Sequence, residues 1–60
     1  MKTYKINGQF YKFELKNDGL MVTFPFGEIY LYKNINTMPN SGKDAFDILY
    51  VNISICERIK

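Results

Sequence analysis

Residues 2–24 read KTYKINGQFYKFELKNDGLMVTF, and two dipeptides, Asn7-Gly8 and Asp18-Gly19, divide this stretch into apolar runs that alternate with polar residues. Both dipeptides are typical of two-residue β-hairpin loops, because Asn, Asp and Gly tolerate the positive φ angles that such turns require. Alternation with a period of two favours strands that bury one face. The stretch therefore predicts three antiparallel strands over residues 2–6, 9–16 and 20–24.

One pairing register satisfies both loops and the apolar pattern together. The predicted cross-strand pairs are Tyr4 with Tyr11 across the first loop, and Leu15 with Val22 and Phe13 with Phe24 across the second. This register places seven apolar residues on one face: Tyr4, Ile6, Tyr11, Phe13, Leu15, Val22 and Phe24. We expect that face to be the core side of an antiparallel β meander.

Residues 28–33 alternate in the same way and predict a fourth strand. The intervening Pro25-Phe26-Gly27 is turn-like, because Pro presets φ and Gly is flexible. A tight two-residue turn would accommodate Phe26 poorly, so we expect a four-residue loop. This loop pairs Phe24 with Ile29.

Residues 34–47 interrupt the alternation and indicate a long connection rich in Asn, Ser, Gly and Pro. Ser41 and Asp44 resemble a weak capping box, which is compatible with a helical turn near residues 42–47. Residues 48–55 then predict a fifth strand, because they are rich in β-branched residues and alternate again. In that strand, Tyr50 lies on the face opposite Leu49 and Val51.

The predicted fold class is all-β with at most one short helical turn, in a single small domain that spans residues 1–60. Five strands and one long connection favour a five-stranded antiparallel meander or a partly open barrel with SH3-like or OB-like architecture. An open sheet with a short helix on one face is the second architecture. The residues expected to be buried are Phe13, Val22, Phe24, Ile29, Leu31, Val51 and Ile53.

A chain of 60 residues buries a small core, so we expect marginal stability and favour self-association, for example as a homodimer. Cys56 is the lone cysteine, which excludes a disulfide within the chain and fits a reducing, cytoplasmic setting. Residues 1–6 lead directly into a strand pattern, so no secretory signal is expected. No apolar run approaches the length of a membrane helix, and no membrane partner is expected.

Catalysis is not expected from these residues. The chain has no histidine, so Cys56 has no imidazole base beside it. Ser41-Gly42-Lys43 does not match a phosphate-binding loop, because the required first glycine is missing and Asp44 follows the lysine. We therefore expect a non-enzyme without cofactor or metal.

The candidate binding surface is the face opposite the predicted core, where aromatic residues lie beside lysines. Its proposed members are Tyr30, Tyr32, Tyr50, Phe10, Lys5, Lys12 and Met21. Tyrosines suit a protein interface because they give a large contact area at a low entropy cost. Aromatic rings between lysines also suit nucleic acid, by stacking on bases while ammonium groups meet phosphates. The alternative without a ligand is that a closed barrel or residues 34–47 cover this face.

The net charge of +2 is too small to identify a polyanionic partner. Residues 1–16 carry four lysines against Glu14 alone, an excess that either faces an acidic partner or keeps an exposed edge from aggregating. We expect a small protein that binds another protein, as an inhibitor or adaptor, and nucleic-acid binding is the alternative. The abundance of Lys, Asn, Ile and Tyr fits an AT-rich genome, such as that of a bacteriophage or a low-GC bacterium.

Overall fold

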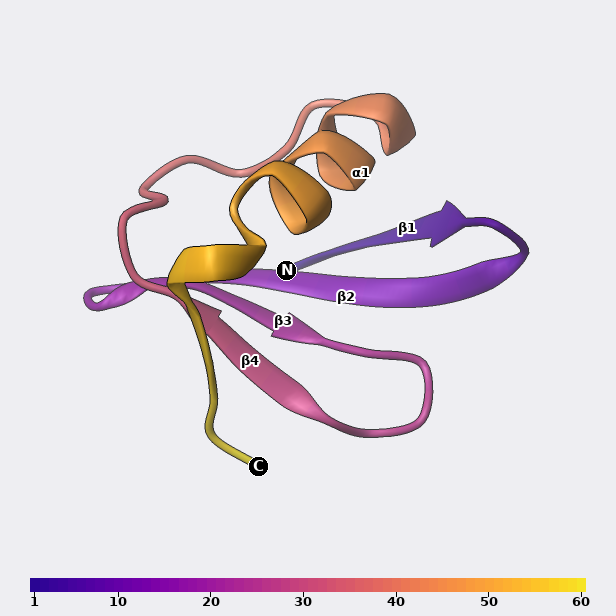
Figure 1. Cartoon of the computed structure of the whole chain (residues 1–60). Coiled ribbons are helices and arrows are strands. Elements are labelled where there is room, and N and C mark those ends of the chain that lie inside the picture. The colour runs from indigo at the N-terminus through magenta and orange to yellow at the C-terminus, as the bar shows by residue number, and fades with distance from the viewer.

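The computed structural model describes all 60 residues as one antiparallel sheet with a helix on one side (Figure 1). The strands, in sheet order, are β1 (Lys2–Ile6), β2 (Gln9–Lys16), β3 (Gly19–Thr23), β4 (Ile29–Tyr32) and β5 (Cys56–Arg58). Helix α1 (Gly42–Val51) and the 3-10 turn η1 (Ile53–Ile55) lie between β4 and β5 in the sequence. The predicted five-stranded meander is thus confirmed, as an open sheet. We call the side that faces α1 the inner face and the opposite side the outer face.

The first hairpin forms as the sequence predicts. Asn7 and Gly8 both have positive φ, at 52° and 81°, as a two-residue loop of this kind requires. Tyr4 pairs with Tyr11, and Lys5 pairs with Phe10. The inner and outer faces of β1 and β2 are therefore the predicted ones.

The second hairpin closes two residues out of the predicted register. Lys16 pairs with Gly19, so the loop residues are Asn17 and Asp18, and Phe13 lies opposite Val22 instead of Phe24. Gly19 instead begins β3 with a φ of 145°, at a place where an added Cβ would lie 2.8 Å from the Cα of Lys33. A shift of two residues preserves the face of every side chain, so the predicted core side of β2 and β3 is retained.

The third hairpin has three loop residues, 25–27, instead of the predicted four. The Gly27 amide donates to the Phe24 carbonyl at 3.0 Å, and the Phe24 amide donates to the Glu28 carbonyl at 2.7 Å. Gly27 has a φ of 102°, so the loop is a turn closed by a glycine that other residues would replace poorly.

The loss of one loop residue reverses the faces of β4. Val22 pairs with Tyr30 and Leu20 pairs with Tyr32, and Ile29 lies opposite Thr23, so the predicted pair of Phe24 with Ile29 is wrong. A one-residue slip moves every side chain of a strand to the other face. Tyr30 and Tyr32 therefore lie on the inner face, and Leu31 lies on the outer face.

The predicted fifth strand over residues 48–55 is also wrong. The helix begins where the capping box indicates, because the Ser41 side chain accepts a hydrogen bond from the Asp44 amide at 3.1 Å. It then continues to Val51, and the fifth strand is the later segment Cys56–Arg58. Ala45 and Leu49 are four residues apart and both are buried, so packing of one helix face overrides the strand propensity of the β-branched residues.

The core lies between the inner face and α1. Its buried members are Ile6, Tyr11, Phe13, Leu20, Val22, Tyr32, Ala45 and Leu49. The Tyr32 hydroxyl donates to the Leu49 carbonyl at 3.2 Å, which joins β4 to the helix. The Tyr4 hydroxyl donates to the Pro39 carbonyl at 2.8 Å, which holds the connection between β4 and α1 over β1.

Only some of the residues that were expected to be buried are buried in the structure. Phe13 and Val22 are fully buried, as expected. Phe24, Ile29 and Leu31 are only partly buried. Val51 and Ile53, which were expected in the core, are 77% and 58% exposed, because they lie at and beyond the end of the helix.

Phe13 is predicted to be the most costly of the five phenylalanine positions to truncate. Phe13→Ala should lower the free energy of unfolding by about 3–5 kcal/mol, because it removes a fully buried ring and leaves a cavity. Urea denaturation measures the change. Phe10→Ala is the matched control, since Phe10 is 60% exposed on the outer face, and an equal loss in both variants would contradict the assigned core.

The helix start provides a second stability prediction. Ser41→Ala should lower the free energy of unfolding by about 1 kcal/mol, because the Asp44 amide loses its acceptor. Ser54→Ala is the control, since Ser54 is an exposed residue of η1. Equal stability of Ser41→Ala and the unmodified chain in urea denaturation would show that the cap contributes nothing.

Candidate protein-binding surfaces

The seven residues predicted to form one surface are divided between the two sides of the sheet. Lys5, Phe10, Lys12 and Met21 lie on the outer face, as expected from the pairs Lys5–Phe10, Lys12–Thr23 and Glu14–Met21. The predicted placement of the three tyrosines beside them is wrong. Tyr30 and Tyr32 are on the inner face because of the three-residue loop, and Tyr50 is on α1.

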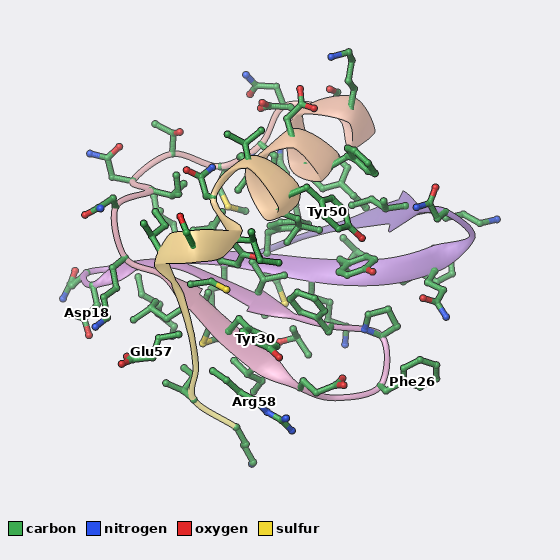
Figure 2. The ribbon with its side chains drawn as sticks, in the orientation of Figure 1. Asp18, Phe26, Tyr30, Tyr50, Glu57 and Arg58 are labelled. Atoms are coloured by element: carbon green, nitrogen blue, oxygen red, sulfur yellow. The ribbon has the colours of Figure 1, made fainter.

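The three tyrosines also differ in accessibility. Tyr32 is fully buried beneath the helix, so it is a core residue in this structure. Tyr50 is 49% exposed and Tyr30 is partly exposed. Both lie on the inner side of the sheet, Tyr30 on β4 and Tyr50 on α1 (Figure 2). Two of the three predicted tyrosines therefore remain available for contact, on the side opposite the lysines.

Helix α1 leaves one corner of the inner face uncovered, and aromatic rings gather there. On the sheet, the Tyr11 and Phe24 ring centroids are 5.1 Å apart, and the Phe24 and Tyr30 centroids are 4.7 Å apart. On the helix, the Phe46 and Tyr50 centroids are 4.6 Å apart, at an i, i+4 spacing. We call these five residues the aromatic surface.

Tyr11 connects the two halves of the aromatic surface. It is 8% exposed, and burial raises the pKa of its hydroxyl, while the neighbouring Tyr50 raises it further. Tyr11 therefore lies at the base, with Tyr50 above it and Phe24 beside it, and Tyr30 adjoins Phe24. Such edge-on and tilted ring contacts stabilise each other and still present ring atoms to a partner.

Two charged residues border the aromatic surface. Arg58 of β5 pairs with Tyr30 across the sheet, and the two side chains are close in Figure 2. Glu28 follows the loop and pairs with Phe24, and its Oε1 atom is buried without a hydrogen-bond partner.

Phe46 and Arg58 are members of this region that the sequence interpretation missed. The predicted strand over residues 48–55 separates Phe46 from Tyr50. In the structure both residues are on α1, which extends to Val51, and their i, i+4 spacing places them on the same side of the helix. Arg58 was not predicted because the expected fifth strand ends at residue 55, whereas β5 is Cys56–Arg58. Arg, Tyr and Phe together are the residue types enriched at the centres of protein interfaces.

The outer face has a different chemistry. Lys5 and Phe10 form a cross-strand pair, with the Lys5 Nζ atom 5.9 Å from the centroid of the Phe10 ring. The middle of the face is aliphatic, with Met21, Ile29 and Leu31 each partly exposed. Phe10 is its one aromatic ring within the strands.

No group of three or more His, Cys, Asp and Glu side chains is arranged to hold a metal ion, and the structure contains no pocket. None of its helices has the length and apolar character needed to cross a membrane. Comparison of the chain with known protein families, with curated proteins and with solved structures finds no match.

The buried Tyr32 hydroxyl gives a pH prediction. Burial, followed by the nearby Cys56, raises the pKa of Tyr32 above its ordinary value, so the folded state favours the neutral hydroxyl. The resulting stability is present at neutral pH and is lost as the pH rises above about 10, the pKa of tyrosine in an unfolded chain.

Urea denaturation between about pH 8 and about pH 11, a range that spans the ordinary pKa of tyrosine, tests this loss of stability. Tyr32→Phe should be less stable at the lower pH, because the hydrogen bond to the Leu49 carbonyl is lost, yet its stability should fall less steeply as the pH rises. Identical pH dependence in both chains would contradict the assignment.

Proposed function

We infer that this chain is a non-catalytic domain that binds another protein through the aromatic surface. The observation that supports this function is the group of rings from Phe46 and Tyr50 on α1, through Tyr11, to Phe24 and Tyr30 on the sheet. All of these rings except that of Tyr11 are partly exposed. Tyrosine and phenylalanine give large contact areas with few rotatable bonds, and Arg58 adds a cationic group at the border.

The distribution of side chains favours a protein partner over nucleic acid. The nucleic-acid alternative requires aromatic rings and lysines on one surface, so that bases stack while phosphates are neutralised. Tyr30 and Tyr50 are on the inner side, whereas Lys5 and Lys12 are on the outer face. A single strand of nucleic acid would have to pass around the edge of the sheet to meet both groups.

A role as an inhibitor or adaptor agrees with a small domain that offers an exposed aromatic surface. We place this activity in the cytoplasm, because Cys56 is a free thiol and the chain has no disulfide to stabilise it in an oxidising compartment. The homodimer expected from the size of the core stays a prediction, which sedimentation of the isolated chain can test.

Co-purification from the native cell, with and without nuclease, is the experiment that tests the function. A protein that remains bound after nuclease treatment is the expected result. Loss of all bound material on nuclease treatment, with recovery of DNA or RNA, would overturn the proposal in favour of nucleic-acid binding.

Truncation of the rings then identifies the surface that binds. Tyr30→Ala and Tyr50→Ala should each weaken binding of the co-purified protein by about 2 kcal/mol, as expected for tyrosines at the centre of an interface. Isothermal titration calorimetry measures the change, and circular dichroism checks the fold.

Phe26→Ala is the matched control. Phe26 is 83% exposed at the tip of the loop between β3 and β4, and Figure 2 shows it apart from Tyr30 and Tyr50. Its truncation removes an exposed aromatic ring outside the aromatic surface, so binding should be unchanged. Full-strength binding by a folded chain that carries both tyrosine substitutions would exclude the aromatic surface.

A further inference from the structure

The outer face of the sheet has no covering layer, although its middle is apolar. Met21 and Leu31 pair across β3 and β4, and Ile29 lies opposite Thr23 beside them. All three apolar side chains are only partly buried. A sheet with helices on both faces would bury these residues, as α1 buries the residues on the inner face.

The outer face carries a net positive charge. Its charged residues are Lys5, Lys12, Lys16, Lys33, Glu14 and Glu57, which together carry +2.

The excess is further confined to two lysines. The Lys16 Nζ atom is 3.1 Å from Glu14, and the Lys33 Nζ atom is 3.4 Å from Glu57, so these charges are paired. Lys5 and Lys12 have no carboxylate partner and lie on the half of the sheet formed by β1 and β2. An apolar centre thus adjoins an unneutralised positive region.

This arrangement selects among the molecules that could cover the face. A second copy placed face to face would bring two positive regions together, which is unfavourable. A nucleic acid would meet one aromatic ring, Phe10, and an aliphatic centre that offers bases little to stack on. An amphipathic helix with leucine-like residues on one side and carboxylates beside them matches both the apolar centre and the charge.

We propose that the outer sheet face binds an acidic amphipathic helix of another protein. The helix lies over Met21, Ile29 and Leu31, and its carboxylates face Lys5 and Lys12. The bound helix forms a third layer opposite α1. Because this site is on the side of the sheet opposite the aromatic surface, the domain can hold two protein segments at once, which is the property of an adaptor.

The test uses two synthetic helical peptides that carry leucine at positions i, i+3, i+4 and i+7. One peptide has glutamate and the other has lysine at the remaining positions. Titration of each into the ¹⁵N-labelled full chain is followed by amide chemical shifts. The glutamate peptide should shift the amides of Lys12, Met21 and Leu31 in a saturable way, and the lysine peptide should not.

Charge-matched variants check the role of the two lysines. The double variant Lys5→Gln, Lys12→Gln should weaken binding of the glutamate peptide about fivefold at low salt, the effect of two exposed charge pairs. The double variant Lys2→Gln, Lys43→Gln removes the same charge outside the outer face, because Lys2 pairs with Phe13 on the inner face and Lys43 is on α1. This variant should bind as the unmodified chain does. Equal affinities of the two double variants would overturn the charge assignment.

Three further results would assign the outer face to another occupant or to none. Tighter binding of oligothymidylate than of the glutamate peptide at the same amides would assign the face to nucleic acid, and a dimer broken by Leu31→Ser would assign it to a second copy. Either result overturns the proposal. Shifts confined to Tyr30 and Tyr50 would overturn it as well, while leaving the function proposed for the aromatic surface intact.

Discussion

The hydrogen bond from the Gly27 amide to the Phe24 carbonyl determines what each side of this protein presents. It closes a loop of three residues, and an odd number of loop residues places the even-numbered side chains of β4 on the inner face. Tyr32 then reaches the Leu49 carbonyl beneath α1, Tyr30 packs against Phe24, and Leu31 lies outside. With one more loop residue, the helix would meet Leu31 in place of Tyr32, and both candidate binding surfaces would be lost.

The two surfaces follow from the size of the helix relative to the sheet. An α-helix of 10 residues is about 15 Å long, which is too short to cover the inner face of five strands. It buries Ala45 and Leu49 against the sheet and leaves Phe24 and Tyr30 partly exposed. The chain has no second helix for the outer face, so Met21 and Leu31 remain partly exposed there.

The sequence predicts a strand register correctly where the loop residues are compatible with only one loop length. Asn7-Gly8 has the positive φ angles of a two-residue loop, so the register of β1 and β2 could be predicted. Pro25-Phe26-Gly27 is compatible with loops of three or four residues, and that single difference changes the face of Tyr30. Since the inner and outer faces are both partly apolar, alternation alone could not distinguish them.

Helix α1 could be predicted only in part from the sequence. Its start could be predicted from Ser41 and Asp44, whereas its extent depends on the burial of Leu49 against the sheet, a long-range contact that competes with the strand propensity of residues 48–55. The same limit explains the candidate site. Tyr30 and Tyr50 are recognisable by residue type, but Phe46, which completes the aromatic surface, and Arg58, which borders it, become apparent only with the helix and β5 in place.

The composition of the aromatic surface couples binding to stability. Its rings belong to two elements, the helix and the sheet, since Phe46 and Tyr50 are on α1 while Tyr11, Phe24 and Tyr30 are on the sheet. A partner that contacts both elements binds only when the helix is docked on the sheet, so its binding free energy adds to that of folding. In a domain with eight residues in its buried apolar cluster, this contribution is large relative to the stability of the free chain. The same rings that limit the stability of the free domain, because they remain exposed, therefore stabilise the bound one.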